Sequence, residues 1–356
     1  MKNQMLFKFY ITEILLSLMF ISGCGLQFNP KPLFANQQEK KEKVTDDEKK
    51  RTLSLACWNV QTFFDSVTDG CEYTDFKNSS KWTKEKYIKR LDKLCEVMTL
   101  LNADVIVLEE IENEAVVQDI VNSLTAGVWS RKKGWQYACF SKEKDSAIGC
   151  AVFSRYELKN LSVHSLDIQI HKTSQPSSRP IMQMTVSAGD KEFELFVNHW
   201  KSKSGGEEET EIWRDWQEAL LSEKIFEPIT NERSVVICGD FNRSIEEFVT
   251  EVESEKLLNE IQTNVGMRRV CGSLVKAYSP WLKEDGTYST EIGSYYYDGG
   301  WERIDNFFFC GKIIVNSFQP VAEAPVADVN SIPQGYKVYN DCGCSDHLPL
   351  KCVISI

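Results

Sequence analysis

Histidine is scarce in this chain, with only four residues among 356. Basic residues are also in deficit, since 41 lysines and arginines face 52 aspartates and glutamates, and the formal net charge at pH 7 is −11. This charge argues against a protein that coats nucleic acid without selectivity, because such binding depends on lysine and arginine. It does not exclude an enzyme whose bound metal ions reverse the charge locally.

The chain also lacks an internal repeat, the cysteine spacing of a zinc ribbon, and an apolar run long enough to cross a bilayer comfortably. Its longest mostly apolar stretch, 14–21, follows Lys2 and Lys8 and ends just before Cys24. A basic N-terminus, a short apolar run and small residues at the cleavage site are typical of an export signal.

Cys24 directly follows an Ile-Ser-Gly sequence and so resembles the lipidated cysteine of a bacterial lipobox. We therefore expect residues 1–23 to be a lipoprotein signal peptide. The exported protein would be anchored in the cell envelope through the lipidated Cys24, facing the periplasm or the exterior. An ordinary signal peptide with a chance cysteine remains the alternative.

Residues 24–52 are polar and rich in charges of both signs, which predicts a flexible tether. Beyond this segment no linker interrupts the chain, and hydrophobic residues make up 42% of the whole sequence. Residues 53–356 are therefore expected to form one domain of ordinary size for an α/β fold. We expect that domain to be monomeric.

Twelve cysteines are present, and removing Cys24 leaves an odd number in an exported chain. Five of them lie in apolar runs and are expected to be buried thiols: Cys57, Cys150, Cys238, Cys310 and Cys352. Cys71, Cys342 and Cys344 lie in loop-like sequence and are the better disulfide candidates. We expect mostly free thiols, with zero to two bridges.

Eight mostly apolar runs predict strands, at 54–58, 105–108, 149–154, 181–186, 193–198, 235–238, 303–310 and 350–356. Several are continuous rather than alternating, which favours sheets covered on both faces. Two amphipathic segments predict helices at 82–101, with Thr83 as N-cap, and at 211–226. The apolar face of the first helix would contain Ile88, Leu91, Leu94, Val97, Met98 and Leu101. Asp298-Gly299-Gly300 predicts a hairpin turn.

Polar residues gather where several of these runs end. Six segments contain them, at 57–59, 107–112, 198–203, 239–242, 303–305 and 345–347. The ends of central strands are common sites in open α/β sheets. Acidic, amide and imidazole groups suit metal-assisted phosphoester hydrolysis.

Taken singly, each segment has a structural alternative. Gly239–Asn242 could be an Asx-turn, Arg303 and Asp305 an ion pair, and the acids of 109–112 the solvated start of a helix. However, two of the four histidines, His199 and His347, fall inside these segments. The other two, His164 and His171, lie in polar, loop-like sequence. The six segments therefore carry more weight together than alone.

The order of Gly239-Asp240-Phe241-Asn242 and Ser345-Asp346-His347 resembles the endonuclease/exonuclease/phosphatase superfamily, which has the deoxyribonuclease I-like fold. The resemblance runs from about Thr52 to the C-terminus. The wider sequence pattern around the motifs is most similar to that of secreted bacterial nucleases of this superfamily. It implies an α/β fold, a four-layered sandwich of two packed mixed β-sheets flanked by helices. Helix 82–101, His199–Gly206 and Tyr295–Trp301 add to the likeness.

Three positions depart from the family pattern. Glu109 stands where glutamine is usual, and Asn306 where tyrosine or histidine is common. Cys342-Gly343-Cys344 replaces a more usual glycine-rich approach to Ser345. The last departure allows a local disulfide or metal near the site.

The resemblance implies a metal site in which Glu110 is the principal ligand, with Asn59 and Asp346 nearby. Such oxygen donors suit Mg²⁺ or Mn²⁺, and Ca²⁺ is also compatible. Asp240 would orient or deprotonate the attacking water, and Asn242 would hold the water or a phosphate oxygen.

The resemblance also implies that His347, oriented by Asp305, and His199 stabilise charge on a pentacovalent phosphorane. Arg179 matches a family arginine that contacts phosphate, although a surface arginine is the simpler alternative. These residues complete the set of candidate site residues.

Three functions remain open. The first is a surface-anchored nuclease for extracellular DNA, with RNA as a second substrate, for which Lys201, Lys203 and 131–133 could contact the phosphate backbone. The second is a phospholipid-headgroup phosphodiesterase or phosphatase of the same fold, like a sphingomyelinase or inositol phosphatase, with the aromatic group around Tyr288, Tyr295–Tyr297 and Trp301 at a membrane. The third is a catalytically inactive surface binding protein.

Overall fold

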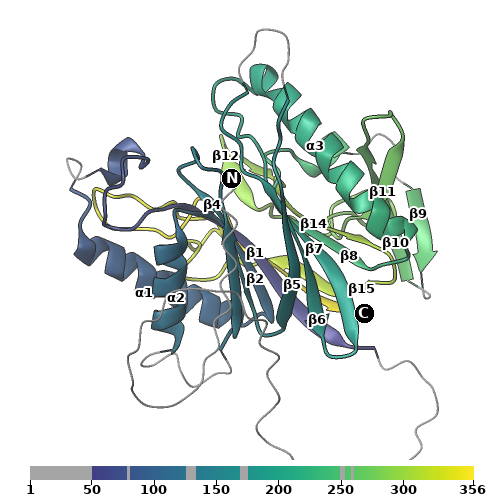
Figure 1. The fold of residues 1–356 in the computed structure, drawn as a ribbon, viewed down its shortest axis with the longest axis horizontal. Coiled ribbons are helices and arrows are strands. Elements are labelled where there is room, and N and C mark those ends of the chain that lie inside the picture. Colours follow the sequence, from purple (N-terminus) through teal and green to yellow (C-terminus); the bar gives the residue numbers. More distant parts are fainter. Residues whose placement is uncertain (1–49, 78–80, 126–133, 169–174, 249–252, 258–259) are drawn as a thin grey trace, which may run out of the picture.

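The computed structural model describes residues 50–77, 81–125, 134–168, 175–248, 253–257 and 260–356. In these residues two large β-sheets pack against each other and helices cover their outer faces (Figure 1). This α/β sandwich is the fold class that the sequence predicts. The predicted signal peptide, Cys24, most of the predicted tether, the basic run 131–133 and His171 lie outside the described residues.

The first sheet has six strands in the order β15-β16-β1-β2-β4-β3. Their bounds are β1 (Thr52–Phe63), β2 (Val105–Ile111), β3 (Tyr137–Ser141), β4 (Gly149–Ser154), β15 (Ile314–Pro320) and β16 (Leu350–Ser355). β1 runs parallel to β2 and antiparallel to β16, so the sheet is mixed. The first and last strands of the domain are therefore neighbours at its centre.

The second sheet has eight strands in the order β5-β6-β7-β8-β14-β11-β10-β9. Their bounds are β5 (Glu157–His164), β6 (Ile181–Ala188), β7 (Lys191–His199), β8 (Val235–Asp240), β9 (Glu253–Leu257), β10 (Glu260–Arg268), β11 (Leu274–Tyr278) and β14 (Asp305–Cys310). β7 and β8 are parallel, whereas β14 is antiparallel to β8. The ends of β7 and β8 and the start of β14 therefore lie side by side.

A separate hairpin joins β12 (Tyr295–Tyr297) to β13 (Gly300–Glu302), and Tyr297 pairs with Gly300. The two turn residues, Asp298 and Gly299, both have positive φ, at 45° and 81°. This geometry matches the twist of the flanking strands and suits an Asp-Gly pair. The hairpin turn that the sequence predicts is confirmed.

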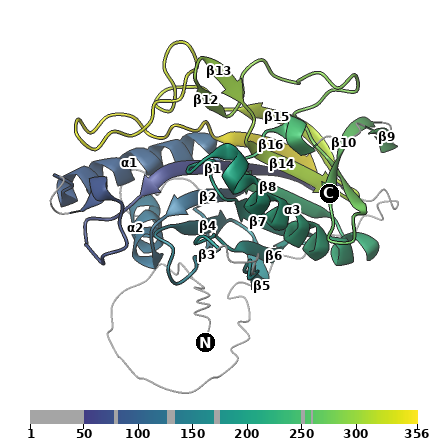
Figure 2. The same cartoon turned by 90° about the horizontal axis from the view of Figure 1, so that it is seen from above.

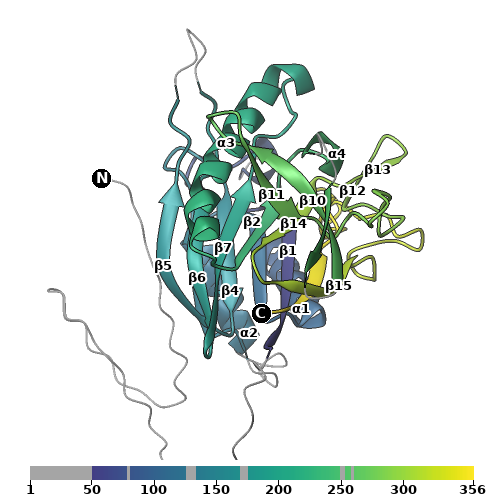
Figure 3. The same ribbon diagram turned by 90° about the vertical axis from the view of Figure 1, so that its right-hand side faces the viewer.

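The helices lie on the outside of the sandwich. α1 (Lys84–Leu101) and α2 (Glu114–Thr125) cover the first sheet, and α3 (Glu207–Thr230) covers the second (Figures 2 and 3). The 3₁₀ turn η1 (Thr74–Phe76) and the short α4 (Ile245–Phe248) complete the set. None of the helices in the described part of the chain is both long and apolar enough to span a bilayer.

The first helix begins as the sequence predicts, because the Thr83 side chain accepts a hydrogen bond from the Lys86 amide. One residue of its predicted apolar face is wrong: Ile88 is 44% exposed. The buried stripe follows Tyr87 and Leu91, and Ile88 lies roughly 100° around the helix from Tyr87. It falls at the edge of the contact with the sheet.

β1 explains why the apolar runs are continuous. Leu55 and Cys57 belong to the core between the sheets, whereas Ala56 and Trp58 belong to the core under α1 and α2. Successive side chains of a strand point to opposite faces, so a strand with packing on both faces needs apolar residues at every position.

All eleven cysteines in the described residues are free thiols. Among the disulfide candidates, Cys71 and Cys342 are exposed. Cys344 is buried, and its thiol donates to the Pro325 carbonyl at 3.2 Å. This agrees with the expectation of mostly free thiols.

Candidate functional site

The second sheet brings three candidate residues into one row. His199 ends β7 and lies beside Asp240 at the end of β8, and Asp240 lies beside Asp305 at the start of β14. All three side chains are buried. Gly239 permits this close approach, because a Cβ there would lie 1.9 Å from the Asn198 carbonyl oxygen.

The first sheet adds Asn59 and Glu110 from the ends of β1 and β2. Asn59 Nδ2 donates to Glu110 Oε1 at 3.2 Å and to Asp240 Oδ2 at 3.0 Å. One amide therefore joins the carboxylates of both sheets. The site lies where the two sheets meet at the ends of these strands.

The orientation of Asn59 bears on its predicted role as a metal ligand. Its oxygen, Oδ1, accepts a hydrogen bond from the Gln61 amide at 2.9 Å and so points away from Glu110. In this arrangement Asn59 donates to the carboxylates, and only a rotation of the amide group would offer its oxygen to a metal ion. We therefore assign it a positioning role.

The backbone that carries these groups is unusual. Gln61, Thr62 and Glu110 have left-handed φ values of 53°, 51° and 67°. Arg90 of α1 is buried and donates to the carbonyls of Val60 and Thr62, each at 3.0 Å, and to that of Gln61. The Thr62 amide in turn donates to Glu110 Oε2 at 2.5 Å. Such conformations persist at functional sites only when the surroundings hold them.

His347 is fixed from three sides. Its Nδ1 lies 2.8 Å from Asp305 Oδ2, its carbonyl accepts from Trp58 Nε1 at 2.9 Å, and its amide donates to Ser345 Oγ at 3.1 Å. The Ser345 hydroxyl donates to the Asn59 carbonyl at 2.6 Å. The C-terminal motif is thus bonded directly to β1.

The charge of Asp305 decides the protonation of His347. Burial alone would lower the pKa of His347, but the negative charge of Asp305 and its hydrogen bond outweigh burial and raise that pKa well above the usual value. His347 is therefore a cation at neutral pH, held by Asp305 through Nδ1.

The surroundings of Asp240 differ from those of His347, because Asp240 is a buried acid beside another acid. Burial, and then the charge of Asp305, raise the pKa of Asp240 to about 7. Its Oδ1 accepts from the Asn242 amide at 2.8 Å. The Asn242 side chain, on a left-handed backbone with φ of 48°, donates to the Trp200 carbonyl at 3.3 Å. A carboxylate with a pKa near neutrality suits a general base.

Arg179 and His199 form a pair. Arg179 Nη2 lies 2.5 Å from His199 Nε2 and donates to the Trp200 carbonyl at 3.1 Å. Burial, and then the charge of Arg179, lower the pKa of His199 well below the usual value. His199 is therefore neutral, and its Nε2 accepts a hydrogen bond from Arg179. The positive charge at this side of the site belongs to Arg179.

Glu109, one of the departures from the family pattern, is fully buried. Its Oε1 accepts from the Cys57 thiol at 2.9 Å, and its Oε2 has no hydrogen-bond partner. Burial raises the pKa of Glu109 well above the usual value, and the charges of Asp305 and Asp240 raise it further. A protonated glutamic acid is neutral and has the shape of glutamine. Glu109 therefore presents a neutral side chain at a position where the family usually has the neutral glutamine.

Two tyrosines near the site were not predicted as site residues. The ring of Tyr295 lies 4.8 Å from that of His347, and burial raises the pKa of Tyr295 to about 12. The pKa of Tyr73 is raised by burial and by Glu110, and lowered less by Arg179. The repeated aromatics around Tyr295 were a signal in the sequence, whereas nothing in the sequence marked Tyr73.

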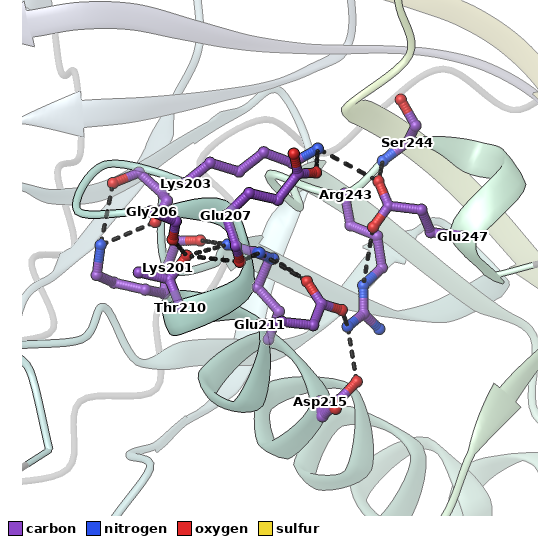
Figure 4. Close-up of polar contacts among 12 residues, drawn as sticks. Lys201, Lys203, Gly206, Glu207, Thr210, Glu211, Asp215, Arg243, Ser244 and Glu247 are labelled. Carbon is purple, nitrogen blue, oxygen red and sulfur yellow. Dashed lines mark hydrogen bonds and ion pairs between the residues drawn. The ribbon is translucent and has the colours of Figure 1, made fainter. Parts of the chain in front are cut away.

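The lysines predicted to contact a nucleic-acid backbone are engaged locally. Lys201 Nζ donates to the carbonyls of Ser202 and Ser204, at 2.8 and 3.0 Å. Lys203 Nζ lies 2.5 Å from Glu207 and 3.4 Å from Glu247 (Figure 4). Both amino groups are therefore engaged with residues of their own loop or of α3 and α4.

Arg243, which follows Asn242, anchors the motif loop to α3. It is buried among carboxylates of α3 and α4: Asp215 lies at 2.8 Å, Glu247 at 3.8 Å, and Glu211 is in direct contact (Figure 4). Glu218 of α3 lies at 2.5 Å. Since Asn242 precedes Arg243 directly, this ion cluster positions the loop that carries Asp240.

The donor groups fit a divalent cation. Glu110 Oε1 and Asp240 Oδ2 share the Asn59 amide, and His199 Nε2 lies 3.7 Å from each of them. Two carboxylates that share one amide donor suit a hard cation, which prefers oxygen ligands. The carboxylates of Asp240 and Asp305 also lie within 4.8 Å of a ring nitrogen of His347, but protonated His347 is not a ligand. The remaining predicted ligand, Asp346, is half-buried.

Residues 54–327 match the sequence model of a protein family described as the Endonuclease/Exonuclease/phosphatase family. No curated protein sequence matches the chain.

Solved structures share the fold at low identity. D. rerio TDP2 complexed with single strand DNA product is 17% identical, covers 85% of this chain and 98% of its own, and has a TM-score of 0.51. The human Nocturnin catalytic domain with bound sulfate anion is 15% identical, with 86% and 97% covered and a TM-score of 0.51. A Bacteroides thetaiotaomicron protein of the endonuclease/exonuclease/phosphatase family is 13% identical, with 86% and 99% covered and a TM-score of 0.51. These likenesses establish the α/β sandwich.

Proposed function

Because the chain belongs to the endonuclease/exonuclease/phosphatase family, we propose that it is a divalent-metal-dependent phosphodiesterase, and specifically a nuclease that cleaves DNA, with RNA as a second substrate. The observation that carries this proposal is the convergence of Glu110, Asp240, the Asp305–His347 pair and the Arg179–His199 pair at one end of the two sheets.

In the proposed reaction, Asp240 accepts the proton of the attacking water as the water oxygen bonds to phosphorus. The bond from phosphorus to the leaving sugar oxygen breaks, and that oxygen takes up a proton from solvent. Without a metal ion the pKa of Asp240 is raised to about 7 by burial and by Asp305, and its place beside His199 and Asn59 suits a base. The backbone amide of Asn242 donates a hydrogen bond to Asp240 Oδ1 and so fixes the direction of that carboxylate. The cationic His347 and Arg179 stand on two sides of Asp240 and stabilise the negative charge that develops on the phosphate oxygens.

Glu110 would hold a Mg²⁺ or Mn²⁺ ion at this site, with Asp240 facing it and Asp346 as a further oxygen donor. The ion supplies positive charge that lowers the energy of the phosphorus transition state. The fit rests on the oxygen-rich donor set, and Ca²⁺ is compatible with the same donors.

A nucleic acid is the substrate that the comparisons favour. D. rerio TDP2, which has the same fold, was solved with a single strand DNA product. In this chain Arg179, rather than the engaged Lys201 and Lys203, offers a cation beside the proposed base. We therefore propose that Arg179 contacts the phosphate that is cleaved.

Anchoring completes the proposal. Lipidation of Cys24 would place the enzyme on the envelope, facing the periplasm or the exterior, where extracellular DNA is the accessible substrate. The charged tether 24–52 would separate the domain from the membrane surface. Incorporation of labelled palmitate into the wild-type protein, and its loss in Cys24→Ser, would test this part independently of activity.

A lipid headgroup is the second candidate substrate, because the β12–β13 hairpin carries aromatic side chains beside the site. Tyr297 is 63% exposed and stacks on Tyr295, with ring centroids 6.2 Å apart. Such a hairpin could meet a membrane interface. Release of phosphocholine or inorganic phosphate from lipid substrates distinguishes this function from nucleic-acid cleavage.

The decisive experiment is cleavage of plasmid and of single-stranded DNA and RNA by purified protein, with Mg²⁺, Mn²⁺, Ca²⁺ or EDTA. We expect metal-dependent cleavage that Asp240→Asn abolishes while the protein stays folded. Absence of metal-dependent cleavage of nucleic acid and lipid alike would overturn the enzymatic proposal and favour a binding role.

A further inference from the structure

A second acidic group lies where the loop between β1 and α1 meets the end of β2. One carboxylate oxygen from each of Asp69, Glu72 and Glu112 lies within 4.8 Å of the others. Glu72 and Glu112 are buried and Asp69 is exposed, so the group opens to solvent on one side. Within the described ranges, none of the three carboxylates pairs with a lysine or arginine.

Glu112 provides an independent sign of a missing partner. Its side chain is fully buried, and its Oε2 accepts from the Asp65 amide at 2.6 Å. Its Oε1 is buried without any hydrogen-bond partner. A buried carboxylate oxygen without a donor is costly, and here it belongs to a group of negative charges.

The other two carboxylates are held in place by the backbone of the loop. The Glu72 carboxylate accepts from the Gly70 amide at 3.0 Å and from the Asp69 amide. Asp69 Oδ1 accepts from the Cys71 amide at 2.9 Å. Each carboxylate oxygen has two lone pairs, so these bonds fix the carboxylates and leave acceptor capacity for a ligand.

From this arrangement we propose that Asp69, Glu72 and Glu112 bind a hard divalent cation, of which Ca²⁺ is the best match. Ca²⁺ takes six to eight oxygen ligands with flexible geometry, whereas Mg²⁺ needs a near-ideal octahedron. Three carboxylates from an irregular loop and a strand end, completed by water, suit the flexible geometry. The ion would supply the partner that Glu112 Oε1 lacks.

The cation would tie the loop to the strand that carries Glu110. The Glu112 amide already donates to the Phe63 carbonyl at 3.1 Å. Tyr73, which follows Glu72, packs on Phe64 with ring centroids 5.3 Å apart. The ion therefore fixes the loop that presents Tyr73 at the catalytic site. Only this last consequence rests on the proposed function, whereas binding does not.

Terbium luminescence tests the binding directly, because Trp82 Nε1 donates to the Asp65 carbonyl at 2.5 Å and the indole can sensitise a nearby Tb³⁺. The Glu110→Gln protein is the parent, because the change removes the principal predicted ligand of the catalytic site. Comparison of variants within this parent then isolates the second site. We expect sensitised emission that Ca²⁺ displaces. The double variant Asp69→Asn/Glu72→Gln should weaken Tb³⁺ affinity at least about tenfold.

Glu114→Gln is the matched control, since Glu114 is an exposed acid two residues after Glu112. It should leave the affinity for Tb³⁺ unchanged. Equal affinity of the parent and the double variant would overturn the proposal, as would an equal loss in Glu114→Gln.

Thermal unfolding separates binding from folding defects. Ca²⁺ should raise the Tm of the Glu110→Gln parent, because the ion binds only the folded state. Glu112→Gln should abolish that rise and yet keep or raise the Tm in EDTA, since it removes a buried carboxyl group with an unpartnered oxygen. The proposal fails if Ca²⁺ leaves the parent's Tm unchanged or if Glu112→Gln retains the rise. These readouts require no cleavage, so they stand apart from any failure of the nuclease assay.

Discussion

Asp240 and Asp305 are direct neighbours across the antiparallel pair of β8 and β14, and both carboxylates are buried. Only Asp305 has a cationic partner within hydrogen-bond distance, since His347 Nδ1 lies 2.8 Å from its Oδ2. The pair is therefore unequal: Asp305 holds a cation, and Asp240 is left with a pKa raised to about 7. Two carboxylates with different environments can take different roles in one reaction.

Asp240 should make the metal-free protein lose stability as pH rises. Its pKa goes from 3.8 to about 7 on folding, so the folded state retains a proton that the unfolded state releases between these values. The contribution is fully present below the unfolded pKa and is lost as pH rises to the folded pKa, with a slope on the order of 1.4 kcal/mol per pH unit.

The measurement is urea unfolding in EDTA from pH 4 to 8, for the wild type and Asp240→Asn. As pH rises across this range, the unfolding free energy of the wild type should fall relative to that of Asp240→Asn. Parallel pH dependences of the two proteins would contradict the assigned pKa.

Glu109→Gln should preserve activity and stabilise the protein at neutral and alkaline pH. The pKa of Glu109 is raised by burial, so the folded state must keep this acid protonated, and glutamine removes that requirement. The gain should grow as pH rises, because an unfolded glutamate ionises freely. Glu109→Ala, which leaves a cavity and an unpaired Cys57 thiol, should destabilise instead.

His347→Gln should reduce the cleavage rate by on the order of 10²–10³-fold, because it removes a cation beside the reacting phosphate. Asp305→Asn should also lower the rate, but mainly by lowering the pKa of His347, so activity should fall at a lower pH than in the wild type. The pH–rate profiles of both variants test this. His164→Gln, on the edge strand β5, is the control and should match the wild type at every pH.

Arg243→Met should destabilise the protein by about 3–5 kcal/mol, because it leaves the buried Glu218 carboxylate without its nearest cation. Lys159→Met removes an exposed ion pair with Glu192 and should change the unfolding free energy little. Denaturant unfolding of the two variants gives the comparison. Similar losses in both would mean that the Arg243 cluster does not anchor the motif loop.

Much of the strand framework follows from the sequence, because strands buried on both faces leave continuous apolar runs. Gly149–Ser154 is found as predicted, and the predicted run 235–238 extends only to Asp240. The strands that the sequence did not reveal, β3, β5, β9, β10, β11 and β15, are shorter, more polar or nearer the edges of the sheets. Their positions depend on pairing with distant partners, which leaves little periodicity to detect.

Helix α2 was not predicted, and the ends of the two predicted helices were harder to predict than their centres. The second predicted helix, 211–226, runs from Glu207 to Thr230. Its first turn is acidic and its last turn contains Pro228, so neither end resembles a regular apolar pattern. The extra turns matter, because Glu207 pairs with Lys203.

The candidate site could be predicted as a set of residues but not as an arrangement. Motif order indicates Asp240, Asp305 and His347, whereas the direction of the Asn59 amide depends on the Gln61 backbone. The neutrality of His199 likewise depends on Arg179, 20 residues away in sequence. Such properties are set by burial and by neighbours from other strands, which residue types alone do not fix.

The place of β16 beside β1 has a consequence for biosynthesis. Ser345 and His347 are among the last dozen residues of the chain, and they bond to Trp58 and Asn59 at its opposite end. A polypeptide still emerging from the ribosome lacks the imidazole and the strand that closes the first sheet. The candidate site is therefore assembled only once residues 345–355 have been synthesised and have paired with β1.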